Sequence, residues 1–574
     1  MATQVNDVIS QVKIDNSANK SIAASAYGEC TTASGTAAKV VDMTGFVLVK
    51  GVTITVKFTN SNTAISPTLN VNSTGAKPIT IYGTTSVGDD EYTSWKAGSI
   101  ISFTYDNTSW VMNDYTNNDL VFSLHSKTLG VFRNNPSEVY GVRIDYDSST
   151  FTRLGNSVGL TSGSDFDNFT PWQRKRCILE DGGHVLAYHG ESGYTETGSL
   201  TQAITKNGAT YPIGTEVQVM VEQQPFWYKV VPISLTPNTD SGIGYHTKCA
   251  EYYISPTPRS GYKLHPAFYG ESRPIYLSAC EGSLYDSALD RMYDDDSDTS
   301  TTINANDKLC SIGNDQKPIS GLRKVLSKPN CELLASRRGN GWHLESIQVY
   351  MMNIFLSMIE FATFNSQNSL GAGVTSIADN SSYNCSSLTG STLSLGNASG
   401  QASSTVNRVG STTTTYTTSG KVSVSYRGQE NPYGNIWKHV QSINFWGDGT
   451  MCGGQAYVNN TLSDFNESKK DGVYVATNIT LANSSGYAKY IGYSSDYDWL
   501  FLTSKTGDGA STSTIIGDYT YVTANLSNAY RIALLGGGWL YGGSAGSLYW
   551  NGYHGVGIRS RHVGGRLMYI PSSS

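Results

Sequence analysis

The chain has 574 residues, a formal net charge of -6 and only 15% charged residues. With 39% apolar residues it is too polar for a membrane protein, and with 11% aromatic residues it is too rich in large side chains for a disordered one. Its length predicts about three or four domains. The acidic balance and the lack of a long Lys/Arg cluster argue against a nucleic-acid partner.

Nothing in the sequence predicts insertion into a membrane or a disulfide scaffold. The most apolar stretch, 349–364, is interrupted by Asn353, Ser357 and Glu360 and is too short to span a bilayer. The eight cysteines stand singly with no CxxC pair, so we expect mostly reduced core thiols. The first twenty residues hold no apolar run of signal-peptide length, which predicts synthesis in a cytoplasm.

The N-terminal part divides into a short segment and a β-rich module. Residues 1–27 are small and polar with a weakly helical pattern, which we interpret as an attachment or oligomerisation segment. Over 28–115, β-branched and aromatic runs such as 46–49, 52–58 and 100–105 alternate with turn residues. Within 52–58, alternation places Val52, Ile54, Val56 and Phe58 on one face. We expect a small antiparallel β module of sandwich type.

The remainder, 116–574, reads as one large domain with inserted loops. Strand-like pieces continue, and Phe226, Trp227 and Tyr228 are expected in the core. A helix is predicted over Trp342–Asn365, because apolar residues recur there at spacings of three and four. Inserted loops are expected at about 232–330 and at 376–420. The second is mostly Ser, Thr, Asn and Gly, and it is expected as a long exposed loop or an irregular hairpin. The predicted fold class is mainly β with some α.

Catalytic and metal-binding signatures are scarce, so the sequence predicts no enzyme, no cofactor and no metal site. The formal GxSxG match at 542–546 lacks the strand and helix that a nucleophile elbow needs. Asp294, Asp296 and Asp298 imitate half of a calcium loop, but Thr299 and Ala305 replace its glycine and closing glutamate.

The last forty residues, 531–570, contain large polar rings spaced by glycines. Tyr and Arg supply contact area at low entropic cost, while Ser, Asn and Gly adapt hydrogen bonding, so the composition is like that of an antibody combining site. The alternative is a glycine-rich terminal hairpin whose rings simply pack. The candidate contact residues are Tyr541, Ser544, Tyr549, Asn551, Tyr553, His554, Arg559, Ser560 and Arg561.

Several segments resemble known families. Arg427-Gly-Gln-Glu-Asn-Pro-Tyr-Gly-Asn-Ile-Trp, followed by the GGGW…GGRL ending, resembles the C-type-lectin-like fold. The similar branch is the one shared by formylglycine-generating enzymes and the variable proteins of diversity-generating retroelements. Segments 336–343 and 362–368 resemble tail-fibre proteins of gut-bacterial phages with this ending. Tyr27-Gly-Glu-Cys-Thr-Thr-Ala-Ser-Gly resembles the start of a β module of phage tail proteins.

The resemblance implies a fixed framework that presents varied contact residues. By position, the framework residues would be Gly536, Gly537, Trp539, Gly564, Arg566 and Leu567. It implies a receptor-binding protein (an adhesin) at the tail-fibre tip of a virion, which recognises a bacterial surface glycan or protein. By analogy the assembly would be a homotrimer that meets other tail or baseplate proteins through its N-terminal part. The formylglycine-generating activity is not expected, because no cysteine follows Cys452.

Two alternatives stay open from the sequence. A structural baseplate or fibre connector would bury the rings of 539–561 in a subunit interface. A polysaccharide-degrading tailspike would need β-helix repeats and paired carboxylates, and neither is apparent.

Overall fold

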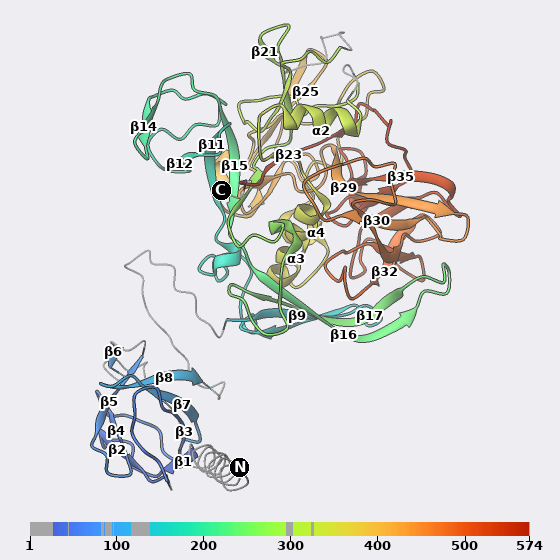
Figure 1. The fold of residues 1–574 in the computed structure, drawn as a ribbon. Coiled ribbons are helices and arrows are strands. Elements are labelled where there is room, and N and C mark those ends of the chain that lie inside the picture. Colours follow the sequence, from blue (N-terminus) through green and yellow to red (C-terminus); the bar gives the residue numbers. More distant parts are fainter. Residues whose placement is uncertain are drawn as a thin grey trace, which may run out of the picture. The chain divides into compact units, whose positions relative to one another are not determined.

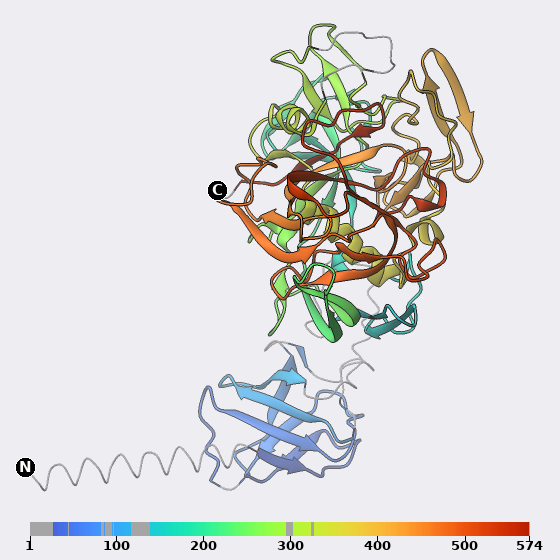
Figure 2. The same ribbon diagram turned by 90° about the vertical axis from the view of Figure 1, so that its right-hand side faces the viewer.

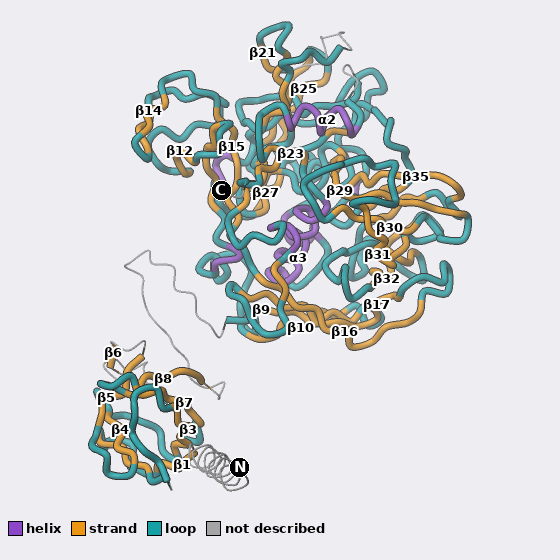
Figure 3. The backbone as a smooth tube through the Cα atoms, viewed as in Figure 1, coloured by secondary structure: helices purple, strands orange, loops and turns teal. Residues whose placement is uncertain are grey.

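The computed structural model describes residues 27–43, 45–81, 85–86, 95, 97–115, 138–293, 302–322 and 326–572. The chain divides into two compact units, Met1–Val131 and Phe132–Ser574. Strands and loops make up most of both units and helices are few, which confirms the predicted fold class (Figure 3). Residues 1–26 of the expected attachment segment and the acidic stretch 294–301 lie outside the described residues. No described helix is long and apolar enough to cross a bilayer.

The first unit contains a mixed sheet in the order β1-β3-β7-β8-β5-β4-β2 (Figure 1). The prediction of a purely antiparallel module was wrong, since β1–β3, β2–β4 and β5–β8 pair in parallel. Parallel neighbours need a crossover connection, and here intervening strands supply it. The strands are Tyr27–Cys30 (β1), Ala38–Val41 (β2), Thr53–Phe58 (β3), Thr68–Val71 (β4), Lys77–Ile81 (β5), Thr85–Ser86 (β6), Ile100–Tyr105 (β7) and Trp110–Tyr115 (β8).

Alternation along β3 builds the core of this unit as predicted. Ile54, Val56 and Phe58 are buried, while the residues between them face outward. The run 46–49 is not a strand: it pairs with no neighbour, yet it still alternates, with Val47 and Val49 exposed.

The second unit is organised around a strongly bent sheet in the order β10-β9-β17-β32-β34-β36-β35-β29-β30-β31, with four further strands paired to it. Figures 1 and 2 show its later strands, β29 to β36, gathered on one side of the unit. The strands are Tyr140–Asp145 (β9), Thr150–Gly155 (β10), Trp227–Pro237 (β16), Tyr245–Ser255 (β17), Lys263–Leu264 (β18), Trp437–Asp448 (β29), Gln455–Asn459 (β30), Tyr474–Thr480 (β31), Gly486–Tyr493 (β32), Thr503–Thr506 (β33), Tyr519–Val522 (β34), Ser527–Leu535 (β35), Trp550–Gly552 (β36) and Val563–Gly564 (β37).

A six-stranded sheet, β12-β11-β15-β19-β38-β23, accompanies the large one. Its strands are Lys175–Glu180 (β11), Val185–Tyr188 (β12), Val217–Gln223 (β15), Ile275–Ser278 (β19), Trp342–Leu344 (β23) and Leu567–Tyr569 (β38). The small sheets comprise Ile204–Lys206 (β13), Ala209–Tyr211 (β14), Ser283–Asp286 (β20), Arg291–Met292 (β21), Lys308–Cys310 (β22), Gly400–Gln401 (β24), Thr405–Val409 (β25), Thr412–Tyr416 (β26), Val424–Tyr426 (β27) and Gln429–Glu430 (β28). The helices are Lys328–Ser336 (α2), Ile347–Phe361 (α3) and Ser366–Leu370 (α4), with short 3-10 turns at Thr170–Trp172 (η1), Pro266–Phe268 (η2), Leu393–Leu395 (η3) and Gly542–Ser544 (η4).

Helix α3 lies in the main core of the second unit and confirms the predicted helix, although it is shorter. It begins after Ser346, whose side chain caps the Val349 N–H, and it ends at Ala362, where φ is +51°. The predicted first turn is instead strand β23, which pairs with β38. Glu360 of α3 is fully buried and pairs with the Arg427 guanidinium at 2.6 Å. Removing one partner of such a buried pair would leave the other charge buried without compensation, which is strongly destabilising.

Two regions expected as loops contain regular structure. Strands β16 and β17 run through the start of 232–330 and pair along most of their length. In 376–420, strands β25 and β26 form a peripheral hairpin (Figure 2), but Cys385, Ser386 and Ser387 are fully buried. This second region is therefore not wholly exposed. Of the three aromatic residues expected in the core, Phe226 and Tyr228 are buried and Trp227 is half-buried. All eight cysteines are free thiols.

Candidate functional site

The C-terminal segment is held at both ends by the two large sheets. Strand β36 lies between β34, to which it is parallel, and β35, to which it is antiparallel. Further on, β37 joins β29 and β38 enters the six-stranded sheet between β19 and β23. The loop 553–562 therefore runs between two fixed strands.

The glycines expected as framework occupy positions where a side chain would not fit. Gly537 has φ of +74°, and a Cβ there would lie 2.8 Å from Ala545 Cβ. A Cβ on Gly564 would lie 2.3 Å from the Ile319 carbonyl oxygen. Gly536 also has a positive φ, +89°, and its carbonyl accepts a hydrogen bond from Gly434 N–H.

The larger residues expected as framework are interior. Trp539, Arg566 and Leu567 are at most 1% exposed. The Arg566 guanidinium donates to the backbone carbonyls of Glu430 and Asn431, so it ties the ending to the segment 427–437. The Trp539 indole N–H donates to the Asp379 carboxylate at 3.2 Å. Their positions are consistent with a structural role.

Five tyrosines form a surface that we call the tyrosine face: Tyr487, Tyr519, Tyr521, Tyr541 and Tyr553. Pairing register places them together, because Tyr487 lies opposite Tyr519 and Tyr521 lies opposite Asn551. Side chains at paired positions, and at every second position, share one face of a sheet. Ring centroids lie 5.4 Å apart for Tyr487 and Tyr519, and 4.9 Å apart for Tyr521 and Tyr553.

Exposure divides the tyrosine face into outer and inner rings. Tyr521 is 39% exposed and Tyr553 is 44% exposed, so both present ring surface to solvent. Tyr487, Tyr519 and Tyr541 are half-buried. Ser544, also half-buried, sits on η4 with its hydroxyl 3.0 Å from that of Tyr487. Tyr541 and Ser544 thus line the face from the loop that follows Trp539.

Two of the predicted contact residues are interior, and we correct their assignment. Tyr549 is only 4% exposed, with its ring edge-to-face against Trp437 at 4.5 Å and Tyr541 at 5.7 Å. Asn551 is 6% exposed, and its side-chain oxygen accepts the Tyr553 N–H. Both point to the same side as the tyrosine face, but other rings and loops cover them. Burial, reinforced by the neighbouring tyrosines, raises the pKa of Tyr549.

Arg561 is engaged within the chain. Its guanidinium makes two hydrogen bonds to the Asp379 carboxylate, at 2.5 and 2.7 Å, and it lies over the Trp539 ring. These contacts with Arg561 lower the pKa of Asp379. This pair of hydrogen bonds, which we call the clamp, attaches the loop 553–562 to Asp379 in the region 376–420. Arg561 is thus a positioning residue at the edge of the face.

The other predicted contacts lie on the loop 553–562. Arg559 is exposed, with its Cβ region against Gly321. The Ser560 hydroxyl lies 3.3 Å from His562 Nδ1, and its carbonyl accepts the Gly321 N–H. His554 is half-buried, and burial together with the nearby Arg531 lowers its pKa. Both effects favour the neutral form of the imidazole.

Sequence reasoning missed Tyr487, Tyr519 and Tyr521. They precede the C-terminal segment and reach it through the pairing of β32, β34 and β36. One local signal was available: the spacing Tyr519-x-Tyr521 within a strand-like run directs both rings to one face.

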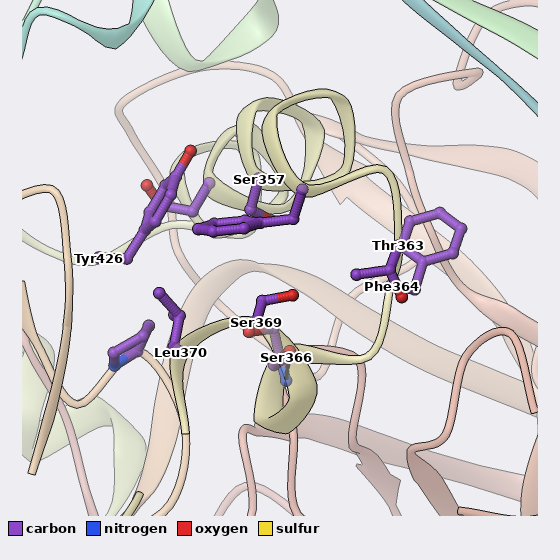
Figure 4. A pocket seen from close by; sticks show the side chains of 11 residues that line it. Ser357, Thr363, Phe364, Ser366, Ser369, Leu370 and Tyr426 are labelled. Atoms are coloured by element: carbon purple, nitrogen blue, oxygen red, sulfur yellow. Dashed lines mark hydrogen bonds between the residues drawn. The ribbon is translucent and has the colours of Figure 1, made fainter. Parts of the chain in front are cut away.

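The described residues offer neither a deep pocket nor a metal site beside this surface. No group of three or more His, Cys, Asp or Glu in the described ranges could hold a metal ion. The cavity of Figure 4 lies between α3, α4 and Tyr426, is lined by side chains such as Ser357 and Ser369, and measures about 20 Å³. That volume suits roughly one water molecule.

Comparison with known proteins gives weak structural matches and no sequence match. No protein-family model and no curated protein sequence matches the chain. Among solved structures, the Major Tropism Determinant P3c Variant is 10% identical, covering 82% of this chain and 91% of its own, with a TM-score of 0.23. The U1 Variant is 11% identical, covering 82% and 92%, with a TM-score of 0.22. Because TM-scores of this size do not establish a shared fold, these matches carry no functional inference.

Proposed function

We propose that this protein is a phage attachment protein that recognises a receptor on the bacterial surface through the tyrosine face. The observation that carries the proposal is the tyrosine face itself, where two paired strands, β32 and β34, and two loops present five tyrosines side by side. Exposed aromatic residues held on rigid strands are typical of recognition surfaces, because few rotamers are lost when a ligand binds.

The surroundings of the tyrosine face support recognition of a partner by a preorganised surface. Gly537 and Trp539 fix the backbone before the exposed Tyr553, and Arg566 fixes it afterwards. A preorganised surface spends less binding free energy on ordering. The rings therefore bind a target without needing a deep pocket.

Further parts of the proposal extend to the whole particle. The C-type-lectin-like resemblance of the ending and the tail-module resemblance of 28–115 support a position at a tail-fibre tip of a virion. The N-terminal part would contact other tail or baseplate proteins. A homotrimer would add avidity to modest single-site affinity.

The direct test is staining of a panel of bacterial strains by the fluorescently labelled full chain, read by flow cytometry. The variant Tyr521→Ser/Tyr553→Ser removes the two most exposed rings of the tyrosine face. The matched control is Tyr245→Ser, because Tyr245 is 48% exposed on β17 and pairs with the end of β32 remote from Tyr487. We expect strain-selective staining that the double variant loses and the control keeps.

Two outcomes would contradict the proposal. Staining that both variants retain would move the contact surface elsewhere. A double variant that no longer assembles would favour a structural connector, with the rings buried in a subunit interface.

A further inference from the structure

The charge distribution around the tyrosine face indicates what kind of ligand it takes, given the proposed role in attachment. The chain from 519 to 574 contains no Asp or Glu. The carboxylate next to Tyr541 is Asp379, and Arg561 already neutralises it. Asp518, directly before β34, is buried, and its carboxylate accepts the Leu548 N–H. The tyrosine face thus offers little free negative charge to a cationic ligand.

Cationic groups near the tyrosine face are likewise engaged or displaced from it. The Lys489 ammonium lies over the Tyr490 ring, beside Asp147. The Arg531 guanidinium donates to the Tyr530 carbonyl, and it lies near His554, whose pKa it helps to lower. Arg559 is exposed on the loop 553–562, and its Cβ lies against Gly321. Tyr553 is the residue of this loop that belongs to the tyrosine face. Besides burial, the groups that raise the pKa of the central Tyr549 hydroxyl are four other tyrosines.

The outer rings match the size and polarity of a sugar. Tyr521 and Tyr553 lie 4.9 Å apart at 37°, forming one continuous aromatic surface. The C–H face of a pyranose packs on such a ring, while its hydroxyls need donors and acceptors at the margin. The hydroxyls of Tyr487 and Ser544, 3.0 Å apart, supply groups of this kind. We propose that the tyrosine face binds an uncharged saccharide whose rings stack on Tyr521 and Tyr553.

A protein receptor fits these observations less well. A stable protein interface covers about 800 Å² on each partner around an apolar centre. Here only two rings of the tyrosine face are more than a third exposed, and the other three are half-buried. A saccharide needs only a few stacked rings at each site, and repeated copies would add the rest of the affinity.

The first test is binding of the full chain to an array of bacterial oligosaccharides, divided into uncharged and acidic ones. We expect binding to uncharged members, weakened about tenfold or more by either Tyr521→Ser or Tyr553→Ser, as loss of a central aromatic contact produces. Tyr245→Ser should bind as the wild type does. Raising NaCl from 50 to 500 mM should change the Kd less than about twofold, because screening acts on charges. Binding confined to acidic members, or weakened strongly by salt, would overturn the proposal.

The second test separates this inference from the attachment role. Stained cells are treated either with periodate, which cleaves vicinal diols of sugars, or with a broad protease. Staining abolished by periodate and kept after protease supports the saccharide. Staining abolished by protease and kept after periodate overturns the saccharide and leaves the attachment role intact. A panel with no stained strain, together with an array with no bound member, overturns both.

Discussion

Replacement of Tyr549 by alanine tests whether its ring is a buried support of the tyrosine face. The sequence predicts a ligand contact, whereas the structure buries its ring against Trp437, Tyr541 and Tyr519, with centroids 4.5, 5.7 and 5.9 Å away. Tyr549→Ala removes a large buried ring, which costs about 3–5 kcal/mol in the free energy of unfolding. For a unit the size of the second one, the unfolding entropy is ~0.9 kcal/mol/K, so the melting temperature should fall by about 4 °C.

Differential scanning calorimetry of the full chain measures this shift in the transition of the larger unit. Tyr549→Phe is the matched control, since it keeps the ring and should melt within about 1 °C of the wild type. Tyr553→Ala, at an exposed position, should also melt close to the wild type. If Tyr549→Ala melted normally and yet lost cell binding, Tyr549 would be a surface contact and the assignment of its burial would be refuted.

Three further predictions concern the supports of the site. A double-mutant cycle on Arg561→Ala and Asp379→Ala should give a coupling of about 0.5–1 kcal/mol, kept small because Asp379 is 39% exposed; zero coupling would contradict the clamp. Because the folded pKa of Asp379 is lowered, that stability is complete above the unfolded pKa, about 3.9, and is lost as pH falls through the folded value, so the coupling should decrease progressively as the pH is lowered below about 3.9. Gly537→Ala should lower the melting temperature more than Gly542→Ala does. Both glycines have positive φ, but only at position 537 would the added Cβ make a close contact, 2.8 Å from Ala545. Equal shifts in melting temperature would show that this close approach is unimportant. Glu360→Gln removes the buried negative charge opposite the Arg427 guanidinium, which keeps its ion pair with the exposed Asp167, so the second unit should be destabilised by about 1.5–3 kcal/mol. Calorimetry should record a lower melting temperature, and an unchanged transition would count against the buried pair.

Local patterns in the sequence predict the elements whose cause is local. Alternation identifies the buried face of β3, and the three-and-four spacing identifies α3. The start of α3 is misplaced because Trp342 and Leu344 fit a helical pattern as well as a strand. Pairing with Leu567–Tyr569, more than two hundred residues later, decides in favour of the strand. Such pairing has no local signature.

The candidate site shows the same division. Glycines and Trp539 identify the framework segment, and the exposed position of Tyr553 follows from its polar neighbours. Alternation along 549–553 places Tyr549 and Tyr553 on one face, but it cannot tell that Tyr541 and Trp437 cover Tyr549. The contribution of Tyr519 and Tyr521 depends on β34 lying beside β36, a parallel pairing across thirty residues. Long-range pairing therefore completes the surface that the sequence predicts only in part.

The central claim is that the tyrosine face contacts the receptor. The most direct measurement is flow cytometry of a stained strain with three proteins: the wild type, Tyr521→Ser/Tyr553→Ser and Tyr245→Ser, each with its melting temperature checked. The predicted result is loss of staining in the double variant alone, with all three proteins melting alike. Equal staining by all three folded proteins would contradict the claim.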